Sequence, residues 1–181
     1  AQVDSFNWLT LDHPPFTIYY LEGDHKAAER VVNHLTVTYA RISQDLEVTI
    51  SQPVRFYLCN SYDSYRKVVG INIPLWSTGL ALPQQNTIVI KTVAAENNYL
   101  TTAVHELTHL IVHQLTNREH IPRWLNEGLA VYFSNEKDFA SSTSISKALI
   151  SNSIVPLSDI DHVLEFNPSK AQLAYQESYV A

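Results

Sequence analysis

The chain has a single cysteine, no methionine and no run of 18 apolar residues among its 181 residues. One cysteine excludes an intrachain disulfide, and the apolar surroundings of Cys59 predict a small buried hydrophobe without a chemical role. Because no apolar run is long enough, no segment of this sequence is expected to span a bilayer. The chain begins Ala-Gln-Val, so we expect a processed or excised segment from which an export signal or anchor has been removed.

Clustered positive charge is also missing from the sequence. Eighteen acidic residues against 12 basic residues give a formal net charge of −6. Without a basic patch, the chain has no electrostatic footprint for nucleic acid or an anionic membrane, which argues against direct nucleic-acid chemistry. Hydrophobic residues make up 45% of the chain, enough to bury a sizeable core. We therefore expect residues 1–181 to form one domain.

What the sequence does contain is a His-Glu-Leu-Thr-His segment over residues 105–109. Residues four apart lie on one face of a helix, so His105 and His109 can direct two imidazoles at one zinc ion. Glu106 lies beside them and can polarise a water molecule on the metal. Apolar residues recur at helical spacing on both sides, which predicts that a helix carries the motif. This helix has three candidate N-caps: Asn97, Asn98 and Thr101.

A second segment, Trp-Leu-Asn-Glu-Gly-Leu-Ala, covers residues 124–130 after a short polar connection. Pro122 suits the first turn of a helix, which places Glu127 inside that helix. Gly128 would let this helix approach the motif helix closely enough for the Glu127 carboxylate to reach the metal. Two imidazoles and one carboxylate leave a fourth position open, which is typical of catalytic rather than structural zinc sites.

Other polar residues near the two segments are possible ligands. His113 continues the face of the two motif histidines, but it is two turns, about 12 Å, from His105, so the two cannot bind one ion. We interpret His113 as a polar residue of that face. Glu119 and His120 lie in the connection between the two helices and remain alternatives to Glu127 as the third ligand.

Together, the segments over residues 105–109 and 124–130 resemble the gluzincin metallopeptidases, and specifically the small bacterial peptidase MA-like domains. The resemblance extends over most of the chain, with supporting segments at residues 16–20, 53–58, 76–81 and 174–179. It implies a thermolysin-like zincin lobe, one zinc ion held by His105, His109 and Glu127, and Glu106 as the general base. It also implies an extracytoplasmic bacterial protein, secreted or anchored through a removed segment.

Two further features of that family bear on this chain. The thermolysin-type subgroup has an acidic residue four positions after the ligand glutamate, where this chain has Val131. In gluzincin aminopeptidases a catalytic tyrosine opens a Tyr-Glu-x-Gly segment, and residues 174–178, Ala-Tyr-Gln-Glu-Ser, resemble that placement. The resemblance therefore implies that Tyr175 hydrogen-bonds the oxyanion of the tetrahedral intermediate. Tyr179, His162 and a residue after Ala181 are the alternative donors, and a tyrosine that only packs under the motif helix is the other interpretation of Tyr175.

The predicted fold class is α+β, with a mixed sheet of about four strands, the motif helix and the following helix that carries Glu127. Apolar patterning predicts, in order, a strand over 16–21, a helix over 26–46, a strand over 54–59, a helix over 62–69, and a hairpin of strands 79–82 and 87–90. Residues 172–181 still read as a helix at the end of the chain. We therefore expect the catalytic domain to be truncated at its C-terminus.

These features predict zinc-dependent hydrolysis of peptide bonds. Zinc would polarise the scissile carbonyl and acidify a water molecule, while Glu106 removes the water proton and passes it to the leaving amine. A peptide or protein substrate would lie against the hairpin edge at Gly79, Leu80 and Ala81; a purely structural edge strand is the alternative. Two other functions stay open: an inactive zinc-binding or interaction module, and a metal-dependent amidase acting on a cell-wall component.

Overall fold

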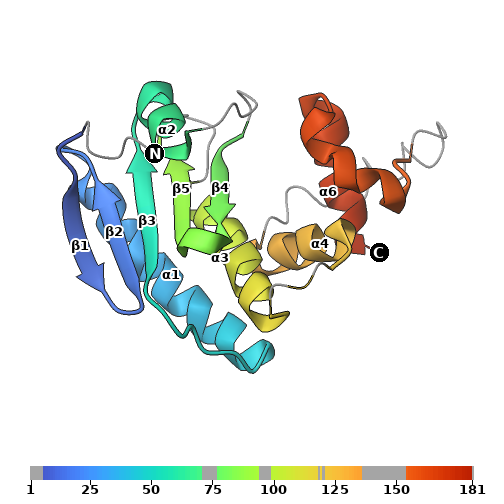
Figure 1. The fold of residues 1–181 in the computed structure, drawn as a ribbon, viewed down its shortest axis with the longest axis horizontal. Coiled ribbons are helices and arrows are strands. Elements are labelled where there is room, and N and C mark those ends of the chain that lie inside the picture. Colours follow the sequence, from blue (N-terminus) through green and yellow to red (C-terminus); the bar gives the residue numbers. More distant parts are fainter. Residues whose placement is uncertain are drawn as a thin grey trace.

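The computed structural model describes residues 6–70, 77–93, 99–117, 119, 121–135 and 154–180. These residues form an α+β fold, as predicted, in which helices flank a five-stranded mixed sheet (Figure 1). In chain order the elements are β1 (Leu9–His13), β2 (Phe16–Tyr20), α1 (His25–Asp45), β3 (Val54–Cys59), α2 (Tyr62–Val69), β4 (Gly79–Leu82), η2 (Pro83–Gln85), β5 (Thr87–Lys91), α3 (Tyr99–Leu115), α4 (Arg123–Ser134), η3 (Leu157–Glu165) and α6 (Pro168–Val180). None of the described helices combines the length and apolar character needed to cross a membrane.

The strands follow the order β1-β2-β3-β5-β4 across the sheet. β2 is parallel to β3 and β3 is parallel to β5, whereas the outer strands β1 and β4 run antiparallel to their neighbours. The predicted hairpin is confirmed, because Gly79 of β4 pairs with Ile90 of β5 and Leu82 pairs with Thr87. Within the described part of the chain, β4 is therefore an edge strand with one side open.

The sheet has one strand more than the sequence predicts. β1 pairs Leu9 with Tyr20 and His13 with Phe16 of β2, across a turn formed by Pro14 and Pro15. Most residues of β1 are exposed, so the strand lacks the apolar alternation that marks a strand with one buried face. At the sequence level such an edge strand resembles a loop, which explains why the prediction of about four strands was too low.

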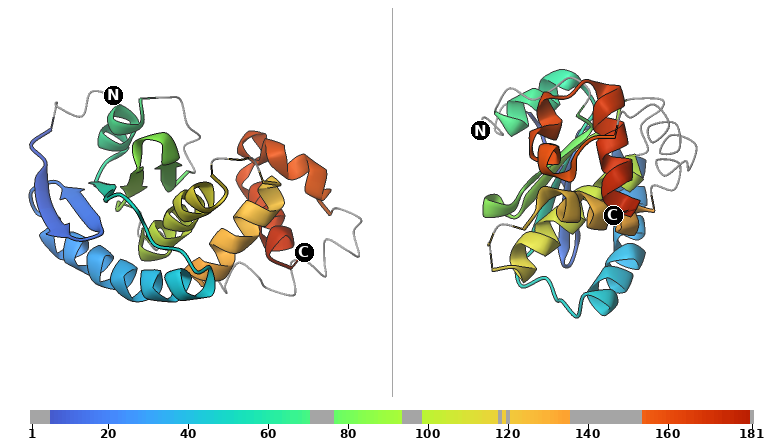
Figure 2. Two further views of the ribbon diagram at one scale, coloured as in Figure 1. Left: turned by 60° about the horizontal axis from the view of Figure 1, so that its bottom comes forward. Right: turned by 90° about the vertical axis from the view of Figure 1, so that its right-hand side faces the viewer.

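The main core lies between one face of the sheet and helices α1 and α3 (Figure 2). The largest fully buried aliphatic and aromatic side chains there include Phe16, Ile18, Leu35, Phe56, Ile88, Leu107 and Leu110. Burying each such side chain stabilises the fold by about 1.5–3 kcal/mol. Helix α2 packs against the opposite face over a second, smaller cluster. The core therefore fixes α3, and with it the direction of the motif side chains.

The motif helix and the following helix that carries Glu127 both form where the sequence predicts them. Helix α3 begins at Tyr99, so Thr101 lies inside its first turn and is not the N-cap; Asn97 and Asn98 lie outside the described residues. Helix α4 begins directly after Pro122, whose fixed φ angle suits the start of a helix.

Helix α4 packs on one side against α3 and on the other side against α6. A Cβ atom built on Gly128 would lie 2.5 Å from the carbonyl oxygen of Ser178 in α6. The prediction that Gly128 makes room for the motif helix is therefore wrong, because it makes room for α6. Successive helix residues are rotated by about 100°, so Glu127 can face α3 while the next residue faces α6.

Replacing Gly128 with alanine should lower the free energy of unfolding by about 1–3 kcal/mol, since the added methyl group must displace backbone rather than a side chain. The greater helix propensity of alanine offsets about 1 kcal/mol of this loss. Urea denaturation of the zinc-free protein measures the change. Gln172→Ala, an exposed substitution in α6, is the control and should change stability by less than about 0.5 kcal/mol. Unchanged stability of Gly128→Ala would contradict this close packing.

Candidate metal centre

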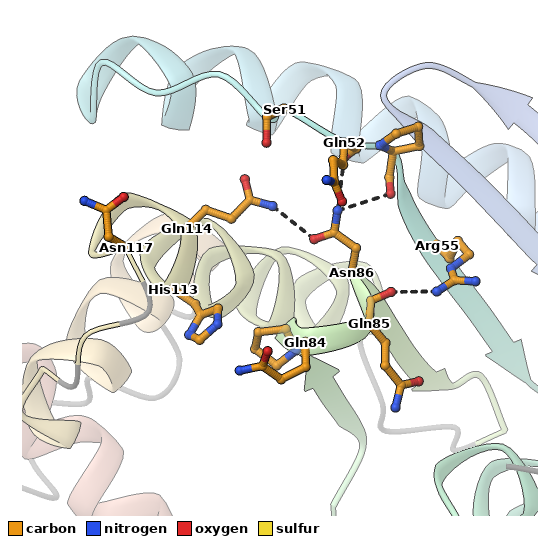
Figure 3. A pocket seen from close by; sticks show the side chains of 11 residues that line it. Ser51, Gln52, Arg55, Gln84, Gln85, Asn86, His113, Gln114 and Asn117 are labelled. Carbon is orange, nitrogen blue, oxygen red and sulfur yellow. Dashed lines mark hydrogen bonds between the residues drawn. The ribbon is translucent and has the colours of Figure 1, made fainter.

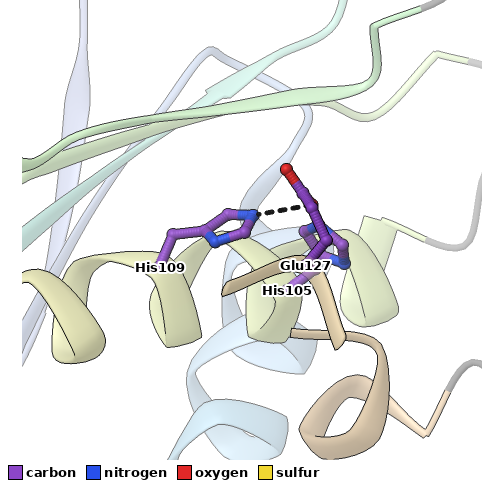
Figure 4. Close-up of side chains that lie close together, drawn as sticks. All are labelled: His105, His109 and Glu127. Atoms are coloured by element: carbon purple, nitrogen blue, oxygen red, sulfur yellow. Dashed lines mark ion pairs between the residues drawn. The ribbon is translucent and has the colours of Figure 1, made fainter. Parts of the chain in front are cut away.

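Two histidines lie one turn apart on α3. The imidazoles of His105 and His109 have ring centroids 4.8 Å apart and planes inclined at 82°. Leu107, which lies between the two histidines in sequence, and Val104 and Leu110, which flank them, are completely buried in the core. Because these apolar residues bind α3 to the sheet, both imidazoles are held on the helix face that α4 approaches (Figure 4).

Glu127 of α4 reaches the two imidazoles. Its Oε2 atom lies 3.4 Å from Nε2 of His105 and 3.4 Å from Nε2 of His109 (Figure 4). The residue is only 4% exposed, and one donor atom from each of the three residues lies within 4.8 Å of the others. The fold thus brings together the three side chains that the two sequence segments single out as ligands.

The two distances from the Glu127 carboxylate to the imidazoles, and the chemistry of all three donors, suit a zinc ion. Zinc binds imidazole nitrogen and carboxylate oxygen at about 2.0–2.2 Å, so two donors of a tetrahedral site lie roughly 3.3–3.6 Å apart. Oε2 of Glu127 is buried and has no hydrogen-bond partner among the described residues. A buried carboxylate oxygen in that state is costly unless a cation holds it. These three residues therefore fit a divalent cation.

The charges in the site depend on one another. Burial alone would raise the pKa of the Glu127 carboxyl, but the imidazoles of His109 and His105 outweigh burial and hold that pKa well below its ordinary value. Burial alone would lower the pKa of His109, and the Glu127 carboxylate outweighs burial there, so that pKa is raised. Glu127 therefore stays ionised, and His109 would have to lose its proton to bind a metal ion.

Arg123 contacts the second oxygen of Glu127. Its Nε atom lies 3.3 Å from Oε1 of that carboxylate, one turn earlier on α4. Val131, at the position where the thermolysin-type subgroup has an acidic residue, is buried and apolar. Arg123 thus orients the carboxylate from the other side and leaves Oε2 directed at the imidazoles. Sequence reasoning missed this contact, although Arg and Glu four residues apart on a helix are neighbours.

Glu106 lies between α3 and the edge strand β4. The backbone N–H of Ala81 donates a hydrogen bond to its carboxylate. Burial raises the pKa of Glu106, and the imidazoles of His109 and His105 oppose that shift. A Cβ atom on Gly79 would lie 2.8 Å from Cγ of Glu106, so the missing side chain at residue 79 makes room for the carboxylate beside the strand.

A series of hydrogen bonds from Tyr65 through Ser77 to Gly79 holds the first residue of β4 in place. These hydrogen bonds were not predicted from the sequence. The Ser77 hydroxyl donates to the Gly79 carbonyl at 2.9 Å, and the Tyr65 hydroxyl lies 3.1 Å from the Ser77 oxygen. Because the Ser77 proton is directed at Gly79, the Tyr65 hydroxyl is the donor to Ser77. Tyr65 is completely buried in α2. No local sequence pattern reveals these hydrogen bonds, because the residues that form them come together only in the folded sheet.

Along β4, the N–H and C=O groups of successive residues point alternately toward β5 and toward the open edge of the sheet. Lys91 N–H donates to the Thr78 carbonyl at 2.9 Å, so in this antiparallel register Leu80 is hydrogen-bonded to β5, while Gly79 and Ala81 turn their N–H and C=O groups outward. The Leu80 side chain packs in the cluster under α2. Among the three predicted substrate-binding residues, Gly79 and Ala81 are therefore the ones with backbone groups at the edge.

Helix α6 brings Tyr175 to the metal centre. Its ring centroid lies 6.1 Å from that of His105, with the planes inclined at 76°. Tyr179, four residues later, is 42% exposed, and His162 in η3 is exposed and lies 3.6 Å from Glu165. Tyr175, the first choice among the predicted oxyanion donors, thus borders the ligand set.

Glu119 and His113 are not part of the cluster formed by His105, His109 and Glu127. Within the described ranges, the only cluster of His, Cys, Asp and Glu side chains with metal-ligand spacing is that of His105, His109 and Glu127. Glu119 is exposed, and His120 lies outside the described residues. His113 lines a polar pocket at the C-terminal end of α3.

A mixed sheet, a helix with the His-Glu-x-x-His motif and a following helix whose glutamate meets the two histidines together form a zincin-like fold. A model of the peptidase MA superfamily matches residues 35–181. The chain belongs to the peptidase MA superfamily, and this confirms the resemblance read from its two motifs. No curated protein shows significant similarity to the chain.

Proposed function

We propose that this peptidase MA superfamily member hydrolyses peptide bonds with the help of one zinc ion. The observation that carries the proposal is the convergence of His105, His109 and Glu127 next to the carboxylate of Glu106. Membership of the superfamily supports a metallopeptidase-type function. Among divalent ions, zinc suits two imidazoles and one carboxylate with an open fourth position.

In the proposed mechanism, His105, His109 and Glu127 would hold the zinc ion, which would supply Lewis-acid chemistry: polarisation of the scissile carbonyl and acidification of a water molecule. Glu106 takes a proton from the water molecule whose oxygen adds to the carbonyl carbon, and it passes that proton to the amine nitrogen as the carbon–nitrogen bond breaks. The Ala81 N–H holds the Glu106 carboxylate in place, so the base is already oriented before the substrate binds. The Tyr175 hydroxyl donates a hydrogen bond to the carbonyl oxygen as that oxygen becomes negative.

We propose that the peptide lies along the open edge of β4. The Gly79 carbonyl already accepts a hydrogen bond from Ser77, and the Ala81 N–H already donates one to Glu106. The peptide backbone would therefore pair with the Gly79 N–H and the Ala81 carbonyl, antiparallel to β4. From the resemblance to bacterial peptidase MA-like domains, we also propose that the protein acts outside the cytoplasm.

A peptide-library digest tests the proposed function. The protein is stripped of metal with a chelator and assayed before and after zinc is restored. Cleavage that appears only with zinc supports the proposal. Zinc binding without any cleavage would favour an interaction module instead, and cleavage of amide bonds in cell-wall fragments, but not of peptides, would favour the amidase alternative.

Tyr175→Phe should lower kcat by about 100-fold, because it removes a hydrogen bond that is stronger in the transition state than in the ground state. Zinc content and thermal stability should change little, since the ring that packs beside His105 remains. Steady-state kinetics on a peptide from the digest, with metal analysis, gives the comparison.

Tyr179→Phe is the matched control, because it removes the same group from the same helix at an exposed position. It should keep wild-type kcat. If Tyr179→Phe were impaired and Tyr175→Phe fully active, the role would move to Tyr179. If both variants were fully active, the donor would lie elsewhere, with His162 next in line.

A further inference from the structure

A polar pocket of about 640 Å³ lies at the C-terminal end of α3, outside the metal centre. Figure 3 shows His113 and Gln114 of α3 on one side of the pocket, and Gln84, Asn86 and Arg55 on the other side. These residues come from α3, from the connection between β4 and β5, and from β3. None of them takes part in the proposed reaction.

The pocket continues the line of the proposed peptide path. Pro83, which contributes to its lining, directly follows β4, and His113 lies one turn after His109 on α3. His113 lies seven positions after Glu106 in α3, which corresponds to a rise of about 10 Å along the helix axis. An extended peptide covers that distance in about three residues. A peptide running antiparallel to β4 would reach the pocket on the N-terminal side of the cleaved bond.

Hydrogen bonds hold the walls of the pocket. Gln114 Nε2 donates to Asn86 Oδ1 at 3.0 Å, which joins α3 to the β4–β5 connection. Arg55 Nη2 donates to the Gln85 carbonyl at 2.6 Å, which joins β3 to the same connection (Figure 3). These two hydrogen bonds hold Gln114, Asn86 and Arg55 before a ligand arrives, so binding does not need to order those three side chains.

The charge of the lining selects the kind of ligand. The lining contains the guanidinium of Arg55 and the imidazole of His113, and it contains no aspartate or glutamate. Several primary amides, including those of Gln84 and Gln114, offer both donors and acceptors. A lysine or arginine side chain would meet the like charge of Arg55 here and no carboxylate to balance it. A carboxylate or an amide would find donors.

We propose that this pocket is a specificity subsite for a substrate residue with a carboxylate or amide side chain, three or four positions before the cleaved bond. The inference rests on the proposed peptidase function and names the substrate class. The braced amides receive the side chain, and Arg55 contributes the charge that separates acidic from basic peptides.

The test uses one peptide scaffold with Glu, Gln, Leu or Lys at the third or the fourth position before the cleaved bond. With the zinc-loaded protein, kcat/KM should be about tenfold higher for Glu and Gln than for Lys. Arg55→Glu should reverse the order of the Glu and Lys peptides. Arg55→Gln keeps a donor to the Gln85 carbonyl and should remove the preference for Glu without reversing it.

Arg66→Glu is the matched control, because it makes the same change of charge at an exposed position of α2. It should keep the wild-type order of peptides. The affinity of the same peptides, labelled, for the zinc-loaded Glu106→Gln protein is measured in parallel by fluorescence anisotropy. This second measurement needs no turnover.

Three results would overturn the inference and leave the proposed function intact. These are cleavage with no preference at the third or fourth position, an order of kcat/KM among the peptides that Arg55→Glu does not change, and a preference only at positions after the cleaved bond. Absence of cleavage together with the expected order of affinities would support the pocket as a peptide site and reject the proposed function. Absence of both would overturn both proposals.

Discussion

Glu106→Gln should lower kcat/KM for peptide hydrolysis by about 10²–10⁴-fold, the range expected when a general base is removed. The amide has nearly the same shape as the carboxylate, but it cannot accept a proton from the water. Zinc content should stay at one ion per chain, because Glu106 is not in the ligand set of His105, His109 and Glu127. Elemental analysis, thermal unfolding and peptide kinetics on the same preparation separate metal, fold and chemistry.

Glu119→Gln is the control for this experiment, since it makes the same chemical change at an exposed residue between α3 and α4. It should hydrolyse peptides at the wild-type rate. Activity of Glu106→Gln close to wild type would reject Glu106 as the base. A wild-type protein that binds zinc but cleaves no peptide would instead favour the interaction module.

Elements with strong local signals could be predicted closely from the sequence. Helix α2 runs from Tyr62 to Val69, as predicted, because Ser61 caps its first turn and Gly70 ends it in the left-handed conformation. β3 also keeps its predicted bounds, since a buried parallel strand reads as an almost continuous apolar run. β1 has neither kind of signal: its residues are mostly exposed and its pairing with β2 is a matter of tertiary structure.

The three candidate ligands could also be predicted, because they lie in strong local sequence motifs. The contacts around them could not be predicted from the sequence. The two histidines and Glu106 follow from residue spacing within a single helix, and Glu127 follows from the specific motif over residues 124–130. By contrast, the Tyr65–Ser77–Gly79 chain joins α2 to the edge strand. No local sequence pattern predicts such a contact, because the contact forms only when the strands assemble into the sheet.

Gly128 illustrates the same limit. Its neighbour Glu127 correctly indicates that α4 approaches α3, and the sequence then offers no way to decide which helix the glycine faces. The carbonyl of Ser178 lies where a side chain at residue 128 would be, so the glycine belongs to the α4–α6 contact. This contact also brings Tyr175 to the metal centre, because Tyr175 and Ser178 lie one turn apart on α6.

Glu127→Ala should weaken zinc binding by more than about 100-fold and abolish zinc-dependent hydrolysis. Changes to residues that only support a metal ligand cost about 10–100-fold in affinity, and this change removes a ligand. Competition with a chromophoric chelator at a fixed pH measures the affinity, because the imidazole ligands must be deprotonated to bind the ion.

Glu127→Ala also takes away a carboxylate that is buried among His105, His109 and Arg123, so its fold must be checked by thermal unfolding without metal. Glu127→Gln is the second variant, because its amide oxygen can still accept from Arg123 but is a weak, neutral ligand. It should fold like the wild type and still lose zinc affinity. If Glu127→Ala bound zinc as tightly as the wild type, Glu127 would not be the third ligand, and Glu119 or His120 would take its place; Glu119→Ala and His120→Ala, measured in the same competition, would show which of the two holds the metal.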